Sequence, residues 1–295
     1  LKEANPLIKT YKRQYGDDKD YTAQFVLEYG KYYRSQKNFD KAIKFFNQVK
    51  SKYSSSDYVD DADYYMALTY LTLNKNEEAF KILSNFYTKY PKSDRLPEVL
   101  NSLGSLYFRS EKFDDAINMF KNALNVCKDR ELKKSILSNL IKTYTFTGFW
   151  DAAQATARRY VDEFPDADDL IFKKIIIGRS YINLNQFQNA VEYLRSIKRE
   201  ADSEIEPEIQ FYIGDAYLKA GEYENAIAEF VKIPLLSKKT KLQWEASALY
   251  YSGQAYEKLG RIPDAVRMYK EIIKRPGIDL TLKKEAEKRI KQIKG

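Results

Sequence analysis

Seven tyrosines recur through this chain at a nearly constant spacing, and this periodicity restricts the fold more than any other feature. The series is Tyr33, Tyr70, Tyr107, Tyr144, Tyr181, Tyr217 and Tyr256, with intervals of 37, 37, 37, 37, 36 and 39 residues. Seven alanines, each nine residues after a tyrosine of the series, follow the same period: Ala42, Ala79, Ala116, Ala153, Ala190, Ala226 and Ala265. Two residue types that repeat together at this period indicate supersecondary units stacked into a solenoid.

Each unit is predicted to consist of two helices joined by a short turn. In the sixth unit, residues 211–233, Gly214 and Tyr217 are three residues apart and share one helical face. Gly221 then ends the first helix, as glycine commonly does just beyond a helix C-terminus. The second helix carries an apolar stripe with a period near 3.6 residues that includes Ala226 and Phe230. We expect the small Gly214 and Ala226 to let the two helix backbones approach closely.

The other units follow the same pattern with few departures. The small residue three before the tyrosine is Gly30, Ala67, Gly104, Gly178, Gly214 or Gly253, and only Ile141 departs. The large residue three before the alanine is Phe39, Phe113, Trp150, Phe187, Tyr223 or Ile262, and Asn76 departs. Four residues after the alanine come Phe46, Leu83, Phe120, Leu194, Phe230 and Tyr269, and Ala157 departs.

This pattern resembles the tetratricopeptide repeat (TPR), a helix–turn–helix unit of about 34 residues. The unit here is about three residues longer, and the resemblance covers almost the whole chain. The resemblance implies an all-α fold, a right-handed α-solenoid with seven complete repeats, an N-terminal half-repeat and a C-terminal capping helix.

The seven repeats are assigned to residues 21–278, as one continuous solenoid domain. Residues 1–20 have the spacing of a second helix whose first helix is missing, so we expect the protein to extend upstream and the open repeat to permit self-association. Residues 279–295 carry one apolar stripe on an otherwise charged helix, as a capping helix requires.

The composition excludes several kinds of catalytic and metal site. The 295 residues include no histidine and a single cysteine, Cys127. A Ser-His-Asp triad, a Cys-His dyad, a histidine-ligated zinc site and an intrachain disulfide are therefore impossible. Aspartates at 60–61 and within 166–169 precede predicted helices, where we expect capping rather than metal binding. We predict that the protein is not an enzyme and has no catalytic residue, cofactor or metal.

In TPR proteins, partners are expected in a concave groove lined by the first helices. The resemblance assigns this lining to the residue three before the small residue of each repeat and to those one, four and five after it. From the central repeats this rule selects a candidate partner-binding groove of Asn101, Phe108, Arg109, Lys142, Phe146, Arg179, Ile182 and Asn183. Apolar side chains among cations suit a peptide with hydrophobic anchors and acidic residues. The alternative is that these cations are scattered surface charges.

The predicted function is an interaction scaffold or adaptor that binds a partner protein or peptide in or beside this groove. No small-molecule substrate is expected. The segments FxxxYPxS and LGxxY are similar to bacterial envelope TPR proteins of the BamD and YbgF type, and the residues that carry the similarity are Phe86, Tyr90, Pro91, Ser93, Leu103, Gly104 and Tyr107. This similarity favours the bacterial periplasm or cell envelope, with the cytoplasm second. No apolar run reaches the roughly 20 residues that a membrane span needs.

A net charge of +8 and a basic C-terminal helix leave two other functions open. One is a binder of polyanions, such as nucleic acid, anionic lipid or cell wall. Nucleic acid is disfavoured because 42 acidic residues offset 50 basic ones and no basic–aromatic motif occurs. The other is a self-assembling structural solenoid.

Overall fold

The computed structural model describes residues 9–10, 13–14, 19–236 and 244–294, and every regular element among them is a helix. The helices are α2 (Lys19–Ser35), α3 (Phe39–Lys52), α4 (Val59–Thr72), α5 (Asn76–Lys89), α6 (Leu96–Arg109), α7 (Phe113–Val126), α8 (Arg130–Thr147), α9 (Trp150–Glu163), α10 (Leu170–Asn183), α11 (Phe187–Lys198), α12 (Glu206–Lys219), α13 (Tyr223–Phe230), α14 (Ile233–Leu236), α15 (Trp244–Lys258), α16 (Ile262–Lys274) and α17 (Leu280–Lys294). This confirms the predicted all-α class.

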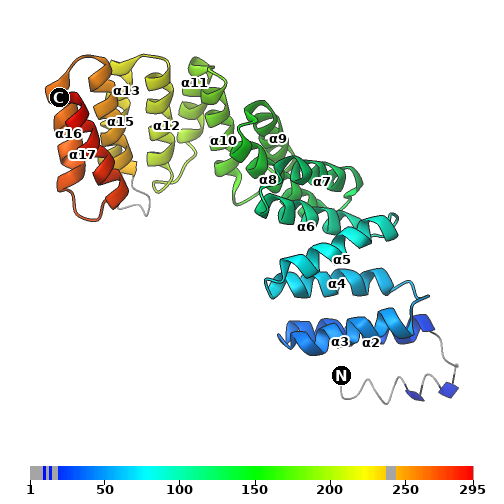
Figure 1. Cartoon of the computed structure of the whole chain (residues 1–295). Helices are drawn as coiled ribbons and strands as arrows, with labels where there is room; N and C mark the ends of the chain where they lie inside the picture. Colours follow the sequence, from blue (N-terminus) through cyan, green and yellow to red (C-terminus); the bar gives the residue numbers. More distant parts are fainter. Residues whose placement is uncertain (1–8, 11–12, 15–18, 237–243, 295) are drawn as a thin grey trace. The chain divides into compact units, whose positions relative to one another are not determined.

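The chain divides into two compact units, Leu1–Thr143 (unit 1) and Tyr144–Gly295 (unit 2), and helix α8 extends over the boundary between them. Within each unit, successive helices pack as hairpins, for example α6 on α7 and α15 on α16 (Figure 1). The assignment of all repeats to one continuous domain stays a prediction. The half-repeat predicted at residues 1–20 lies almost entirely outside the described residues.

The alanine series forms the centre of the helical hairpins, since all seven periodic alanines have no exposed surface. The small residue of the first helix has a different neighbour from the one we expected. A Cβ atom added to Gly104 would lie 2.6 Å from Cε1 of Phe120, which is four residues after Ala116. Gly104 therefore makes room for a large ring from the second helix, and the ring fills the space between the helices. Gly178 makes room for Leu194 in the same way.

The periodic tyrosines lie at the edge of this core. Tyr144 and Tyr256 are 6% and 9% exposed, and the other five are half-buried. Several of their rings face a cation, such as Arg261, whose guanidinium carbon is 4.8 Å from the ring centroid of Tyr256. Lys41 lies 5.0 Å from the ring of Tyr33 in the same way. A ring with one apolar face and one face toward a cation suits the border between core and solvent.

One turn conformation joins the two helices of every repeat. The residue four after each tyrosine has a positive φ, between 57° and 81°: Lys37, Asn74, Glu111, Gly148, Asn185, Gly221 and Gly260. The next backbone N–H donates to the carbonyl oxygen of the tyrosine, for example from Lys112 to Tyr107 at 3.0 Å. The pattern of glycines predicts this left-handed turn only in part, because non-glycine residues occupy it in four repeats.

Helix α17 (Leu280–Lys294) lies where the capping helix is predicted and packs on α16. Its apolar stripe, which includes Ala286 at 0% exposure, faces the core of unit 2. No helix among the described residues has the length and apolar character needed to cross a membrane.

A buried carboxylate joins three helices of unit 2. Glu229 on α13 is 6% exposed and accepts hydrogen bonds from Arg195 of α11 (2.8 Å) and Gln210 of α12 (2.6 Å). Lys232 donates a further bond of 2.6 Å to it. Burial alone would raise the pKa of the Glu229 carboxyl, but hydrogen bonds from Lys232, Gln210 and Arg195 hold this pKa below its ordinary value.

The replacement Glu229→Gln is expected to lower the free energy of unfolding by about 1–3 kcal/mol near pH 7, because buried donors lose their charged acceptor. A lowered pKa in the folded state stabilises the protein above the ordinary carboxyl pKa of about 4.3, and this contribution is lost as the pH falls through the folded value. Urea unfolding at pH 7, 5, 4 and 3 should therefore show a stability difference that is unchanged between pH 7 and 5 and shrinks below the ordinary carboxyl pKa of about 4.3. Glu224→Gln, at an exposed position on the same helix, is the control, and a pH-independent difference would contradict the assignment.

Candidate partner-binding surface

The eight candidate groove residues divide between the two units. Unit 1 contains Asn101, Phe108 and Arg109 on α6 and Lys142 on α8. Unit 2 contains Phe146 near the end of α8, together with Arg179, Ile182 and Asn183 on α10.

In unit 1 the structure brings α6 and α8 into contact at two levels. Asn139 Nδ2 donates to Asn101 Oδ1 at 2.9 Å near the middle of α6. Two turns further along α6, the ammonium of Lys142 lies 4.8 Å from the ring centroid of Phe108. Ser105 lies between these levels and turns its hydroxyl back to the carbonyl oxygen of Asn101, at 3.0 Å. We call this strip, with Arg109 at its end, the α6–α8 seam: Asn101, Ser105, Phe108, Arg109, Asn139 and Lys142.

Both cations of the seam lack an acidic partner within the described part of the chain. Arg109 and Lys142 are exposed, and no carboxylate there lies within ion-pair distance of either. The ring of Phe108, half-buried, also packs edge-to-face on Phe113 at 5.5 Å. The seam therefore presents a cation-covered aromatic ring, unmatched positive charge and a pair of carboxamides to solvent.

Two of the candidates in unit 2, Ile182 and Arg179, are less accessible than a groove-lining position requires. Ile182 is 1% exposed and belongs to the core, so it cannot contact a partner directly. The half-buried guanidinium of Arg179 lies 5.2 Å from the ring centroid of Tyr212 and 6.0 Å from that of Trp150. Asn183 is exposed and donates to the backbone carbonyl of Arg179 at 2.8 Å. Arg179 thus contributes to packing. The prediction of a groove cation did not foresee its contacts with Tyr212 and Trp150.

Phe146 is the most accessible apolar candidate, with 67% of its surface exposed. The sequence rule missed Asn139, which completes the carboxamide pair of the seam. Asn139 lies two residues before Ile141, whereas the rule selects the residue three before it. The recurrence of an asparagine in consecutive first helices was the available signal.

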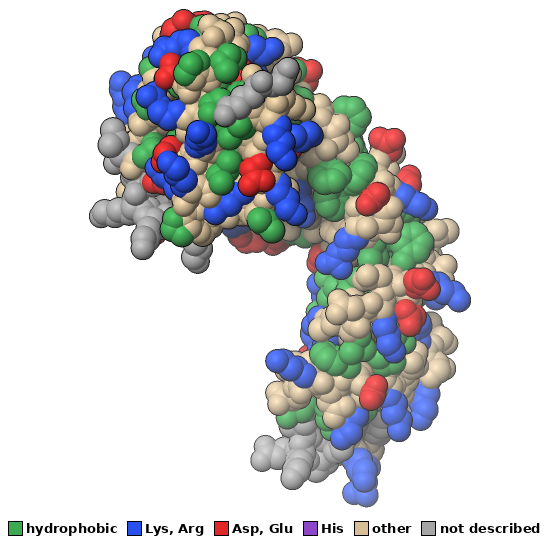
Figure 2. Space-filling model, turned by 60° about the vertical axis from the view of Figure 1, so that its left-hand side comes forward, with side chains coloured by type: hydrophobic (Ala, Val, Ile, Leu, Met, Phe, Trp, Pro, Cys, Tyr) green, Lys and Arg blue, Asp and Glu red, His purple; other side chains and the backbone are tan. Residues whose placement is uncertain are grey.

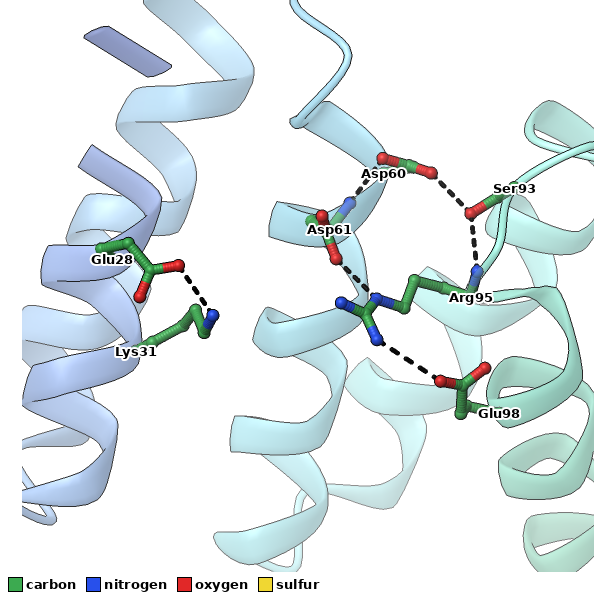
Figure 3. Close-up of polar contacts among 7 residues, drawn as sticks. All are labelled: Glu28, Lys31, Asp60, Asp61, Ser93, Arg95 and Glu98. Carbon is green, nitrogen blue, oxygen red and sulfur yellow. Dashed lines mark hydrogen bonds and ion pairs between the residues drawn. The ribbon is translucent and has the colours of Figure 1, made fainter. Parts of the chain in front are cut away.

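A polar cluster in unit 1 fixes α6 against α4 (Figure 3). Arg95 Nε donates to Asp61 Oδ1 at 2.6 Å, and its Nη1 lies 3.4 Å from Glu98 Oε1. Its guanidinium carbon also lies 5.6 Å from the ring centroid of Tyr64. Burial alone would lower the pKa of Arg95, but the hydrogen bond and charge of Asp61 raise it. The cation is therefore fully matched and offers little to a partner.

Helix capping is the wrong interpretation for two of the aspartates. Asp61 binds Arg95, 34 residues further along the chain, instead of its own helix end. Asp169 is the N-cap residue of α10 but makes no side-chain cap bond. Its Oδ1 accepts from the hydroxyl of Tyr160 at 2.6 Å, and Lys173 lies 3.1 Å from its other oxygen. These carboxylates join neighbouring helices.

The FxxxYPxS segment has a structural role in the connection between α5 and α6. Phe86 is buried, and its ring lies 5.0 Å from that of Tyr90. The hydroxyl of Tyr90 donates to Asp63 Oδ2 at 3.1 Å, and that of Ser93 donates to Asp60 Oδ2 at 2.5 Å. The segment ties this loop to α4, so packing within the repeat accounts for these residue types.

The basic C-terminal helix uses part of its charge inside the molecule. Arg289 Nη2 lies 2.7 Å from Glu257 Oε2, and the hydroxyl of Tyr269 donates to the other oxygen at 2.5 Å. Figure 2 shows Lys and Arg side chains intermixed with Asp and Glu over the visible surface. The pairing of Arg289 with Glu257 leaves the surface of α17 less strongly basic than its sequence indicates.

Stacked helical hairpins with one turn geometry and one packing rule define a helical-repeat protein. Family profiles described as tetratricopeptide repeat match residues 26–56, 61–93, 99–134, 177–233 and 247–277. The chain therefore belongs to the tetratricopeptide repeat proteins, as its periodicity predicts.

Solved structures show the same fold. A tetratricopeptide repeat protein from Parabacteroides merdae is 13% identical, with 92% of this chain and 99% of that chain matched at a TM-score of 0.54. The apo form of RapI is 12% identical, and the match covers 93% of this chain and 82% of that chain at a TM-score of 0.64. A chain from the structure of Naa15/Naa10 bound to HypK-THB is 16% identical, and the match covers 92% of this chain and 39% of that chain at a TM-score of 0.56. Identities this low show the fold alone. No curated protein sequence matches the chain.

Proposed function

We propose that this chain is a non-enzymatic interaction scaffold that binds a partner protein or peptide at the α6–α8 seam of unit 1. The observation that supports the proposal best is the pairing of Phe108 with Lys142 beside unmatched Arg109. An aromatic ring with adjacent cations at an otherwise polar surface is typical of a contact that anchors an apolar side chain and an acidic one.

Photo-crosslinking in the protein's own cells tests this surface. A benzoylphenylalanine at Ser138, a lining position of α8, is expected to form an adduct with the partner. The same residue at Lys121, exposed on the second helix α7, is expected to form none. Equal labelling from both positions, or none from Ser138, would contradict a partner on the first-helix surface.

We also propose an envelope or membrane-associated setting, which rests on the similarity of the FxxxYPxS and LGxxY segments to bacterial envelope repeats. The adduct from Ser138 then contains an envelope protein, identified by mass spectrometry. A ribosomal or metabolic partner would reject this setting and leave the scaffold function in place.

A further inference from the structure

The carboxamide pair of the seam retains the hydrogen-bonding groups of a peptide bond. The bond from Asn139 Nδ2 to Asn101 Oδ1 uses one donor and one acceptor. The side-chain oxygen of Asn139 and the side-chain N–H groups of Asn101 have no partner within the described residues. One free acceptor and free donors on adjacent carboxamides complement the N–H and C=O of an incoming backbone.

The opposite end of the seam is positively charged. Lys142 and Arg109 are exposed and have no acidic partner among the described residues, and the ammonium of Lys142 lies 4.8 Å from the ring centroid of Phe108. A carboxylate that docks there can pair with both cations, and a hydrogen bond between charged groups is stronger than one between neutral groups.

The distance between the carboxamide pair and the cations of the seam allows one extended segment to contact both. Asn101 and Phe108 are seven residues apart on α6, which corresponds to about 10.5 Å along a helix. An extended chain rises about 3.3 Å per residue, so three residues of a bound segment span about the same distance. Ser105, the residue between these levels, is small, and its hydroxyl donates to the carbonyl oxygen of Asn101 on its own helix.

We propose that the seam binds an extended segment of a partner protein that carries an acidic residue three positions from the residue whose backbone the Asn101–Asn139 pair holds. The acidic side chain contacts Lys142 and Arg109. The inference rests on the proposed function and adds the chemistry and register of the partner. Charge complementarity selects this occupant, because the described seam has two unmatched cations and no unmatched carboxylate.

The test uses synthetic peptides of the sequence Leu-Ala-Ala-Leu-Glu-Leu-Ala-Ala-Leu, labelled with fluorescein, capped at the C-terminus and measured by fluorescence anisotropy on the full chain. Exchange of the glutamate for glutamine is expected to weaken binding about tenfold. In Lys142→Gln this preference should fall to about twofold, because one of the two cations is gone. Equal preferences in the two proteins would overturn the carboxylate contact.

The register is tested by N-methylation, which removes one backbone donor. Methylation of the two alanines three residues from the glutamate is expected to weaken binding at least fivefold. Methylation of the two alanines two residues away is the matched control and should have a smaller effect. In the Asn101→Ala, Asn139→Ala double variant the two placements should become equivalent. Equal effects on the wild-type chain, or no binding of any peptide, would overturn the proposal.

Failure of this inference can be told apart from failure of the proposed function. If the peptides do not behave as expected while Ser138 still crosslinks to a partner, the register is wrong and the scaffold surface stands. If Ser138 gives no adduct, the surface itself is rejected.

Discussion

Replacement of Phe120 by alanine is expected to lower the free energy of unfolding by about 3–5 kcal/mol, the usual range for a fully buried phenylalanine. Phe120 is 1% exposed and fills the space between α6 and α7 above Gly104. Loss of the ring leaves a cavity that backbone glycine on the facing helix cannot fill. The measurement is chemical unfolding followed by far-UV circular dichroism. Tyr87→Ala, which removes an aromatic ring that is 41% exposed, is the control and should cost far less.

A double-mutant cycle with Gly104 shows whether the ring and the glycine act as a pair. In the wild-type chain, Gly104→Ala is expected to destabilise by about 1–3 kcal/mol, because the new methyl group would overlap a ring carbon. In the Phe120→Ala chain the same change is expected to stabilise, by up to about 1 kcal/mol, because alanine favours a helix more than glycine does. If Gly104→Ala changed the stability in the same direction in both chains, the contact between residue 104 and the Phe120 ring would not be what requires glycine there.

The chain contains a natural version of the compensated pair. Repeat two has Ala67 in the place of Gly104 and Leu83 in the place of Phe120, and both are fully buried. The double variant Gly104→Ala, Phe120→Leu copies that arrangement, so it should be more stable than Gly104→Ala alone.

Reversal of both cations of the seam, Arg109→Glu with Lys142→Glu, is expected to weaken partner binding about a hundredfold. The loss of stability should be small, about 0.5–1 kcal/mol, because only the exposed contact between the Lys142 ammonium and the Phe108 ring is removed. Neither cation has an acidic partner in the described structure, so their reversal breaks no internal ion pair. Each reversal replaces an attraction to an acidic ligand by a repulsion, and a tenfold loss for each corresponds to about 1.4 kcal/mol. Affinity is measured against the partner captured through Ser138.

Arg179 is an unsuitable second site for this experiment, although the sequence predicts it as a groove cation. Its guanidinium rests on Tyr212 and Trp150, so a carboxylate there would remove packing and lower the stability of unit 2. The matched control is Lys81→Glu with Lys121→Glu, which makes the same charge change at exposed positions of second helices. An equal loss in both double variants would indicate a general charge effect and not a contact at the seam.

The same two variants decide between a protein ligand and a polyanion. Binding to nucleic acid or an anionic surface depends on the total positive charge and falls steeply with added salt. In that case both double variants lose affinity, and wild-type binding disappears between low and moderate salt. A segment held by Phe108 and the Asn101–Asn139 pair retains most of its affinity at the higher salt concentration.

The turn between the two helices of a repeat could be predicted from the sequence in some repeats and not in others. Gly148, Gly221 and Gly260 are glycines at a position that needs a positive φ, and their type predicts the turn. Lys37 and Glu111 adopt the same conformation without any local signal. Their turns are held by the hydrogen bond to the tyrosine carbonyl and by the packing of the flanking helices. Tertiary contacts therefore override residue preference there.

The sequence also could not show how accessible each candidate residue of the surface is. The rule that places lining residues depends on helix geometry, and it selects Asn101, Phe108 and Lys142, which lie on the facing sides of α6 and α8. It could not distinguish Lys142, which is exposed, from Arg179, which two rings enclose. The difference depends on Trp150 and Tyr212, which belong to other helices.

The order of residues along the chain was enough to establish a helical repeat, its period, and the alanines and small residues at the centre of each hairpin. These features follow from contacts within one unit, which recur each time the unit is repeated and therefore leave a periodic pattern. The matching of charges was decided only in three dimensions. Asp61 pairs with Arg95, and Glu257 pairs with Arg289. Lys142 has no acidic partner among the described residues. Each of these outcomes depends on contacts between neighbouring repeats, and such contacts vary from one repeat to the next.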